Sequence, residues 1–249
     1  MTNIIQDVKP AGTASAYVEK PFDEAKAELE GAGYEIISLP QFAKLRIDQE
    51  KDAHVSNYGA YTKEGFLYVP QKGIFLVRNS PIMDNAKEAT QCHRKGNEFY
   101  LTDKQVEESL VDSIQVKVKH GETIPTKRFG ENDLTAYAFG AEAENYGVFL
   151  KEAGIKEMPV YLANIANKAF ARQAWLHRLV ADGQSFLDGY YWVLNCNLAV
   201  RGVKVASADE GSASVARNLY SPESFFKACT KAGIVIQGDL ESKIRGNLK

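Results

Sequence analysis

The chain has 249 residues, of which 45% are hydrophobic and 25% are charged, and its formal net charge is −2. These values are ordinary for a globular protein with its own core, and the charge excludes binding to nucleic acid through an overall positive surface. The start of the chain has no basic segment followed by an apolar run, and no stretch is long and apolar enough to span a membrane, so we expect a soluble, cytoplasmic protein.

The N-terminal part is predicted to form an arm, a helix and a strand. Residues 1–19 are mostly small or polar, as in an extended arm. Pro21 stands at a favoured first position of a helix, and 34–39 read as a strand after that helix. Residues 40–60 are weakly patterned, with an exposed loop expected at 51–57.

The next part of the chain predicts a hairpin followed by two helices. The turn Pro70–Gly73 separates two apolar runs, which is typical of a β-hairpin. Ser80 and Gly96 bound the first helix, and Thr102 and Gln105 have the spacing of a capping box at the start of the second. The predicted elements are strands at 66–69, 74–77 and 99–101 and helices at 80–94 and 102–111.

Residues 113–167 are predicted to form an α/β insert. The expected order is a half-exposed strand at 114–118, a polar loop at 119–130, a helical region at 132–150 that is broken at Gly140, and a strand at 158–163. Alternation of apolar residues with Lys is the signal for the first strand, and Gly154 ends the helical region.

The C-terminal residues are predicted to form a linker and a helical tail. Residues 206–219 are small and polar, and Ser221 and Asp239 start two helices with apolar stripes. The predicted organisation is an N-terminal arm with a helix–strand segment at 1–63, a domain at 64–205, and the linker and tail at 206–249.

The segment from Phe170 to Val203 differs in composition from the rest of the chain. It holds both tryptophans but no Lys, Glu or Met, although the whole chain has 21 Lys and 20 Glu residues. Because strands disfavour Lys and Glu, a buried core hairpin is one explanation. Aromatic residues mixed with Asn, Asp, Ser and Gly are also typical of a binding surface. Composition alone leaves both interpretations open.

We find no motif for catalysis or for metal or phosphate binding. Glycine-rich phosphate-binding spacings are absent, and the four histidines show no metal-ligand spacing. Cys92 and His93 are adjacent on a predicted helix, so we expect a core cysteine and a surface histidine rather than a nucleophile–base pair. Because the three cysteines show no CxxC spacing, we expect free thiols. No catalytic residue, metal or cofactor is predicted.

Two segments are locally basic, at 113–128 and 158–181. Because Phe170 and Trp175 lie in the second segment, a nucleic-acid-binding patch is an alternative function. It requires both segments to share one face and binding to weaken steeply with salt. Solvated surface charge is the commoner explanation, so no nucleic-acid partner is expected.

The order of hairpin, helix, short strand, helix, insert and aromatic hairpin resembles the C-type lectin fold. Residues 80–110 resemble the two-helix segment of that fold, and Trp175 resembles the tryptophan at the start of its final sheet. Ala199–Val203, which reads Ala-Val-Arg-Gly-Val, resembles its closing strand. The resemblance covers about 64–205 and implies an α+β, C-type lectin-like fold with an α/β insert and a helical C-terminal extension.

The end of the chain is similar to the variable proteins of diversity-generating retroelements, particularly archaeal ones. In that family a reverse transcriptase copies a template with errors at adenines, and the copy replaces the 3′ part of the target gene. Variants of the usual Asn codons include Tyr, Asp, Ser, Gly, Phe and Cys but never Lys, Glu, Gln, Met or Trp. This matches the composition of 170–203, from which Gln184 and Trp192 depart. The residues at 204–249 also depart from the family, whose variable regions often end the chain.

The resemblance implies a binding protein that displays a hypervariable patch, at about 174–199, to an unidentified ligand that we expect to be a protein. The predicted ligand-binding residues are His177, Asp182, Phe186, Asp188, Tyr190, Tyr191, Asn195, Cys196 and Asn197. The predicted scaffold residues are Phe170, Arg172, Trp175, Leu187, Leu194, Arg201 and Val203. We expect the patch side chains to be clustered and solvent-accessible, and Trp175 and Arg201 to be structural, with Trp175 buried.

The same fold also hosts two other activities. Calcium-dependent sugar binding uses Glu-Pro-Asn, Gln-Pro-Asp and Trp-Asn-Asp motifs, all of which are absent from this chain. Formylglycine-generating oxidation needs a local cysteine pair, whereas Cys196 has no neighbouring cysteine in the sequence. A second thiol close to Cys196 in the folded chain would favour that oxidoreductase, which therefore stays an alternative.

Overall fold

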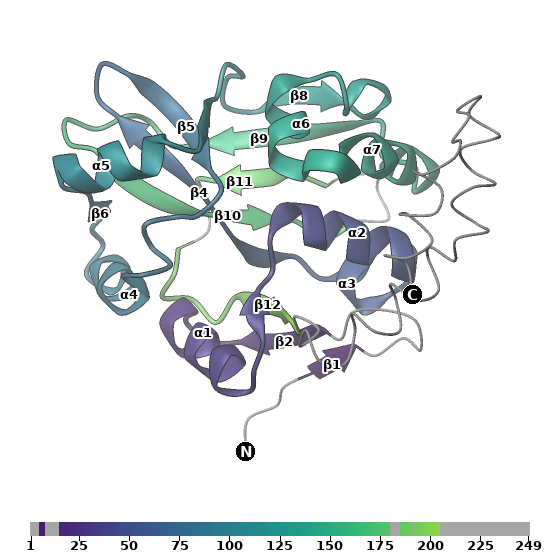
Figure 1. Cartoon of the computed structure of the whole chain (residues 1–249), viewed down its shortest axis with the longest axis horizontal. Coiled ribbons are helices and arrows are strands. Elements are labelled where there is room, and N and C mark those ends of the chain that lie inside the picture. Colours follow the sequence, from purple (N-terminus) through teal and green to yellow (C-terminus); the bar gives the residue numbers. More distant parts are fainter. Residues whose placement is uncertain (1–4, 8–14, 180–184, 192, 205–249) are drawn as a thin grey trace, which may run out of the picture. The chain divides into compact units, whose positions relative to one another are not determined.

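The computed structural model describes residues 5–7, 15–179, 185–191 and 193–204. In this part of the chain the strands join into one sheet, with the main order β1-β2-β12-β4-β10-β11-β9-β8 (Figure 1). The strands are β1 (Ile5–Asp7), β2 (Ser15–Glu19), β3 (Glu35–Ile36), β4 (Ala60–Val69), β5 (Gly73–Val77), β6 (Phe99–Tyr100), β7 (Ser113–Gln115), β8 (Glu122–Pro125), β9 (Glu157–Leu162), β10 (Phe170–Leu176), β11 (Leu187–Gly189) and β12 (Ala199–Val203).

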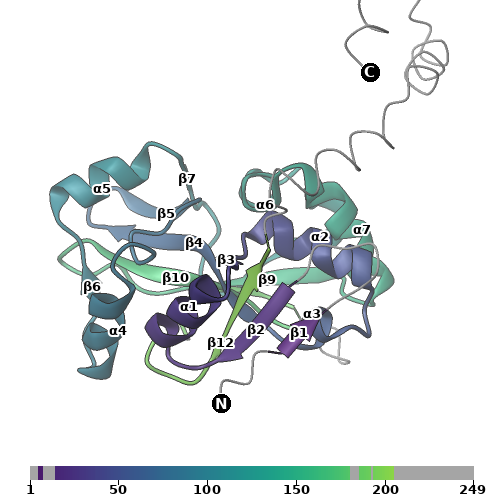
Figure 2. The same cartoon turned by 60° about the horizontal axis from the view of Figure 1, so that its bottom comes forward.

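Helices cover parts of this sheet. They are α1 (Phe22–Gly31), α2 (Leu39–Gln49), α3 (His54–Asn57), α4 (Ala86–Arg94), α5 (Asp103–Leu110), α6 (Asp133–Phe139) and α7 (Ala143–Glu152), with 3-10 turns η1 (Thr126–Arg128) and η2 (Gly140–Glu142). Helices α2, α6 and α7 pack together on one side of the sheet, as both views show (Figures 1 and 2).

The last described strand, β12, lies between β2 and β4 (Figure 2). Val200 pairs antiparallel with Val18 and parallel with Tyr61, so strands from both ends of the described chain share the sheet. The prediction of an arm over 1–19 is therefore wrong for Ser15–Glu19. These residues form a strand whose first four side chains are buried, because β12 supplies the hydrogen-bonding partner that an arm would lack.

Helix α2 replaces the end of the strand predicted at 34–39 and the first half of the weakly patterned segment after it. The Oγ of Ser38 accepts a hydrogen bond from the Gln41 N–H (3.3 Å), and the Gln41 side chain accepts one from the Ser38 N–H (2.9 Å). This capping box, with Pro40 in the first turn, starts the helix and limits the strand before it to Glu35–Ile36. Helix α3 likewise occupies part of the predicted loop.

The predicted hairpin is confirmed as β4 and β5, with Leu67 opposite Phe75. Gly73 in its turn has a φ of 113°, a conformation that side chains other than glycine rarely adopt. The two helices that follow are present as α4, which begins later than predicted, and α5, whose capping box joins Thr102 and Gln105.

The segment from β7 to β9 contains the predicted strands and the helical region, which Gly140 breaks at a φ of 55°. The predicted loop at 119–130 instead contains β8, which pairs antiparallel with β9. Strand β9 also runs parallel to β11, with Val160 opposite Leu187. This pairing brings the segment 113–167 next to the segment from Phe170 to Val203, which holds both tryptophans.

The segment from Phe170 to Val203 supplies β10, β11 and β12, with residues 190–191 and 193–198 outside helices and strands. The predicted division at residue 63 falls inside β4, and elements on both sides of it share one sheet. The predicted linker and helical tail at 206–249 lie outside the described residues. Within the described ranges, none of the helices has the length and apolar character needed to cross a membrane.

Candidate ligand-binding surface

A cluster of aromatic rings lies beside the ends of β9 and β11. Its rings belong to His120, Tyr161, His177, Phe186, Tyr190 and Tyr191, and we refer to these six residues as the aromatic patch. Tyr161 in β9 meets the rings of Phe186 (5.1 Å between centroids) and Tyr191 (5.2 Å), and His177 stacks on Phe186 (3.9 Å). The patch therefore combines side chains that precede β11 in the sequence and side chains that follow it with Tyr161 of β9.

His120 joins the patch from the turn before β8. Its ring meets Tyr190 edge to face at 5.2 Å and lies 5.6 Å from Tyr161. Its Nδ1 lies 2.7 Å from the Leu162 carbonyl oxygen, which fixes the imidazole against β9. His120 and Tyr161 were not among the predicted ligand-binding residues.

Exposure divides the predicted ligand-binding residues. Tyr190 and Tyr191 are 40% and 54% exposed, so their predicted accessibility is confirmed. Cys196 and Asn197 are also exposed, whereas His177, Phe186 and Asn195 are half-buried. Asp182 lies outside the described residues.

The prediction that Asp188 is accessible is wrong, since this residue is 1% exposed. Its Oδ1 accepts hydrogen bonds from the N–H groups of Tyr190 (2.6 Å) and Tyr191 (3.1 Å). Burial raises the pKa of the Asp188 carboxyl, and these two hydrogen bonds oppose the rise. Asp188 therefore shapes the turn that carries the two exposed tyrosines instead of facing solvent.

The turn containing Asn195, Cys196 and Asn197 packs next to α1. The Phe22 N–H donates to the Leu194 carbonyl oxygen (2.8 Å), which fixes the start of this turn to the helix. Among the described residues, no ring contact or hydrogen bond joins this turn to the aromatic patch. The structure thus brings together four of the predicted residues, His177, Phe186, Tyr190 and Tyr191, and places the turn separately.

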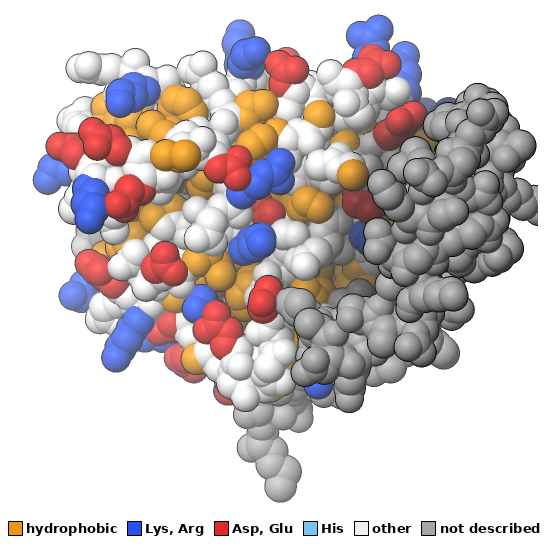
Figure 3. Space-filling view, viewed as in Figure 1, with side chains coloured by type: hydrophobic (Ala, Val, Ile, Leu, Met, Phe, Trp, Pro, Cys, Tyr) orange, Lys and Arg blue, Asp and Glu red, His pale blue; other side chains and the backbone are white. Residues whose placement is uncertain are grey.

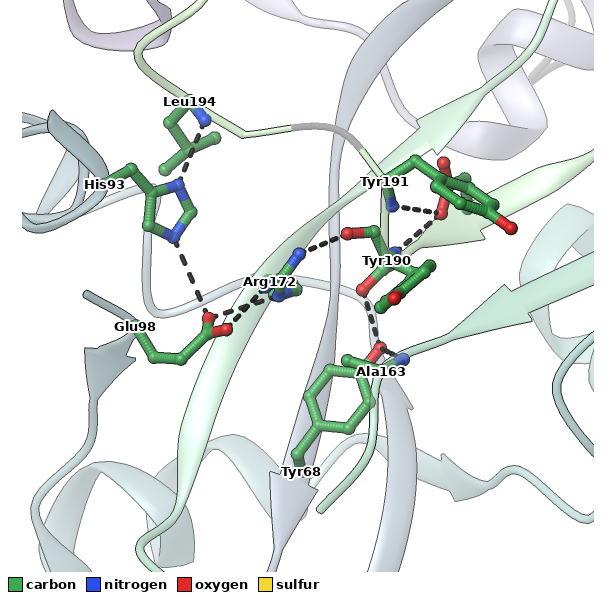
Figure 4. Close-up of polar contacts among 10 residues, drawn as sticks. Tyr68, His93, Glu98, Ala163, Arg172, Tyr190, Tyr191 and Leu194 are labelled. Atoms are coloured by element: carbon green, nitrogen blue, oxygen red, sulfur yellow. Dashed lines mark hydrogen bonds and ion pairs between the residues drawn. The ribbon is translucent and has the colours of Figure 1, made fainter. Parts of the chain in front are cut away.

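Tyr68 of β4 holds the end of β11 through a backbone atom. Its hydroxyl donates to the Gly189 carbonyl oxygen (2.8 Å) and accepts from the Ala163 N–H (3.2 Å), as Figure 4 shows. A Cβ at Gly189 would lie 2.5 Å from the Phe66 ring and 2.7 Å from the Tyr68 hydroxyl. Only glycine fits this close approach, so Gly189 has a packing role at the end of β11.

Arg172 of β10 likewise binds a backbone atom of the next residue, Tyr190. Its guanidinium donates to the Tyr190 carbonyl oxygen and forms an ion pair with Glu98, whose Oε2 lies 3.1 Å from the arginine Nε. Figure 4 shows Arg172 lying between these two groups. Both side chains of the ion pair are largely buried, at 13% and 24% exposure, so this contact is better shielded from solvent than a surface pair.

Arg46 of α2 holds the other side of the segment. This fully buried guanidinium donates to the His177 carbonyl oxygen (2.8 Å), the Val55 carbonyl oxygen (3.1 Å) and the Tyr146 hydroxyl (2.7 Å). The Leu179 N–H donates to a backbone carbonyl of α3 at 2.7 Å. These contacts fix the chain where it leaves β10.

His93 is buried in α4, contrary to the predicted surface position, whereas Cys92 is only half-buried. The His93 Nδ1 accepts a hydrogen bond from the Leu194 N–H (3.0 Å), and its Nε2 lies 4.0 Å from a Glu98 oxygen (Figure 4). Burial lowers the pKa of His93 to about 4, so the ring is neutral at pH 7 and free to accept this bond. The contact with the segment after β11 explains why the histidine faces inward.

Six of the seven predicted scaffold residues are buried: Phe170, Trp175, Leu187, Leu194, Arg201 and Val203. Arg172 is the half-buried exception. Trp175 packs edge to face on Tyr61 (5.1 Å), and a Cβ at Gly59 would lie 2.8 Å from the indole. The guanidinium of Arg201 donates to the Ser15 Oγ (3.0 Å).

Sequence reasoning missed the residues that reach this segment from elsewhere in the chain. Arg46, Tyr68, His93 and Glu98 lie far from it in sequence, and no local pattern marks them. The cysteines in the described part, Cys92 and Cys196, are free thiols. No group of His, Cys, Asp and Glu side chains within the described ranges could hold a metal ion.

No protein-family model and no curated protein matches this sequence. One solved structure matches at a TM-score of 0.58 and 13% identity, over 80% of this chain and 100% of the other. It comes from work described as "Accommodation of massive sequence variation in Nanoarchaeota by the C-type lectin fold". This chain has a C-type lectin fold. The fold predicted from the hairpin, the helix pair and the closing strand is thereby confirmed.

Proposed function

We propose that this protein binds a ligand through a hypervariable surface carried on its C-type lectin fold. The observation that carries the proposal is a division between backbone and side chains among the described residues of 177–194. Side chains elsewhere in the fold bind its backbone atoms, whereas Tyr190 and Tyr191 expose their rings. Exposed clustered rings are unusual on a protein that binds nothing. Replacing the side chains of Tyr190 and Tyr191 would leave these backbone hydrogen bonds in place.

We propose further that a diversity-generating retroelement varies this surface. The similarity in fold to a protein studied for massive sequence variation in Nanoarchaeota supports this proposal, as does the absence of Lys, Glu and Met from 170–203. The proposed varied positions are His177, Phe186, Tyr190, Tyr191, Asn195, Cys196 and Asn197, with Asp182 added from the sequence alone. Asp188 moves from the predicted patch to the constant scaffold because it is buried, and Gly189 joins the scaffold because of its close packing.

Sequencing the neighbouring DNA tests the retroelement proposal. We expect a near-copy of the region coding for 170–203, together with a reverse-transcriptase gene. Differences between the copies should fall where the template has adenine and should affect Tyr190 and Tyr191 but leave Arg172 and Gly189 unchanged. A gene with no such repeat, or a repeat that varies Gly189, would contradict the proposal.

We propose binding rather than catalysis, with a protein as the ligand. Affinity would come from a few aromatic anchors, each contributing about 2–4 kcal/mol at the centre of an interface. No thiol pair near Cys196 is found in the described part of the chain, so no observation favours the formylglycine-generating alternative. For nucleic acid, the face seen in Figure 3 shows acidic and basic side chains intermixed rather than a basic surface.

A further inference from the structure

The aromatic patch contains a closed group of four rings. His120, Tyr190, Tyr191 and Tyr161 follow one another with centroids 5.2, 4.6, 5.2 and 5.6 Å apart, the last distance returning to His120. Neighbouring planes are inclined by 59° to 88°, so edges meet faces. These spacings leave no room for a ligand between the rings. A ligand must therefore lie on the faces that Tyr190 and Tyr191 turn to solvent.

The polar atoms around these faces are suited to hydrogen-bond donors from outside. The hydroxyl groups of Tyr161, Tyr190 and Tyr191 make no hydrogen bond within the described part of the chain, so each can accept one. Asp188 uses only Oδ1 for the turn, and its buried Oδ2 has no hydrogen-bond partner among the described residues. The positive charge of Arg172, which also acts on Asp188, is offset by its ion pair with Glu98.

We propose that this ring group binds a guanidinium group, as an arginine side chain of the protein ligand. A planar guanidinium stacks on a tyrosine face, where the ring quadrupole attracts a cation, and its N–H donors fit the free hydroxyl oxygens. The Asp188 carboxyl group binds the backbone N–H groups of the same two tyrosines, and its ionised form would favour a cation over a neutral group. This inference rests on the proposed function, because it takes the aromatic patch to be the binding surface.

His120 and Tyr161 give this site a constant part. They belong to the segment before and within β9, outside the stretch proposed to vary, and each contacts a tyrosine after β11. A site of this composition keeps two of its rings while Tyr190 and Tyr191 change. The preference for arginine therefore depends on Tyr190 and Tyr191 as they are in this sequence, supported by the constant residues His120 and Tyr161.

A titration of the full chain with capped arginine tests the inference, and capped citrulline is the uncharged control of the same shape. With ¹³C-labelled tyrosine and histidine rings, NMR reports which rings respond. We expect arginine to shift the ring signals of His120, Tyr161, Tyr190 and Tyr191 and to bind about two- to thirtyfold more tightly than citrulline. Tyr100, which is 48% exposed in β6, should not respond.

Two variants separate the charge from the rings. Asp188→Asn keeps the Oδ1 acceptor of the turn but removes the charge, and should bring arginine binding close to that of citrulline. Tyr191→Leu removes an exposed ring with little effect on folding and should weaken arginine binding, whereas the matched change Tyr100→Leu should not. Equal binding of arginine and citrulline, or ring shifts caused only by a neutral sugar such as methyl mannoside, would overturn the inference. Failure of the proposed function would appear differently, as unfolding when exposed patch residues are replaced.

Discussion

Glu64 shows how a single buried carboxyl group links β4 to α2. Its side chain is 1% exposed, and its Oε2 accepts a hydrogen bond from the Leu39 N–H (3.0 Å) in the first turn of the helix. Burial raises the pKa of Glu64 to about 7, and this hydrogen bond only partly opposes the rise. The folded state therefore favours the protonated carboxyl group relative to the unfolded chain.

This raised pKa predicts a pH dependence of stability. The stabilising contribution of Glu64 is fully present below the unfolded pKa of about 4.3 and is lost as the pH rises through about 7. The loss amounts to roughly 4 kcal/mol at most, since the two pKa values differ by about 2.7 units and one unit corresponds to about 1.4 kcal/mol. Urea unfolding from pH 4 to 8 should show a flatter profile for Glu64→Gln than for the parent. Parallel profiles would show that Glu64 does not titrate in this range.

Trp175 is the residue on which the predicted framework depends most. Trp175→Ala removes an indole that is 5% exposed and packs on Tyr61, so the variant should lose about 3–5 kcal/mol of unfolding free energy. Denaturant titration measures this loss. An unfolding curve equal to that of the parent would place Trp175 outside the core.

At the scale of elements, β4, β10, α2 and α4 all act on the segment between β10 and β12. Each supplies one side chain that binds a backbone atom: Tyr68, Arg172, Arg46 and His93, respectively. A backbone atom is the same whatever side chain its residue carries. This arrangement explains how one fold can keep its shape while the displayed residues change.

Coupling energies test this arrangement at Arg172. Arg172→Met should cost roughly 2–4 kcal/mol, because it leaves the largely buried Glu98 without its partner. Tyr190→Ala should cost about 0.5 kcal/mol or less, because the ring is exposed. The two effects should add, since Arg172 binds the carbonyl oxygen of Tyr190 and this atom is unchanged in Tyr190→Ala. Arg172→Met and Glu98→Gln should instead be strongly coupled. Strong coupling between Arg172 and the Tyr190 ring would mean that the side chain itself supports the fold.

Local signals predicted most of these elements, and the misses have physical causes. The capping box at Thr102 predicts α5, and the same pattern at Ser38 and Gln41 marks the start of α2, which is therefore predictable from the sequence. The burial of Asp188 could not be predicted from the sequence, because it depends on a hydrogen-bonded turn that closes only after β11 pairs with β9. His120 enters the aromatic patch through that same non-local pairing.

At the scale of the molecule, the pairing of β2 with β12 and of β9 with β11 joins distant parts of the chain into the sheet that carries the candidate surface. The buried residues that support this surface come from elements between α1 and β12, whereas the exposed residues of the surface itself belong to one short segment. A surface of this kind changes composition with little change in the core. The central claim is therefore that the fold tolerates substitutions at the exposed positions of this surface.

A library that varies the exposed positions Tyr190, Tyr191, Cys196 and Asn197 together tests this claim most directly. Each position would carry the residues that variants of an Asn codon encode, and the free energy of unfolding of the members would be measured by proteolysis. We expect most members to fold within about 1–2 kcal/mol of the parent, since each surface change costs about 0.5 kcal/mol or less. The same variation at the buried residues Tyr68, Phe170 and Leu187 should unfold nearly all members. If the exposed library unfolds to the same extent as the buried one, the segment supports the core and is not a display surface.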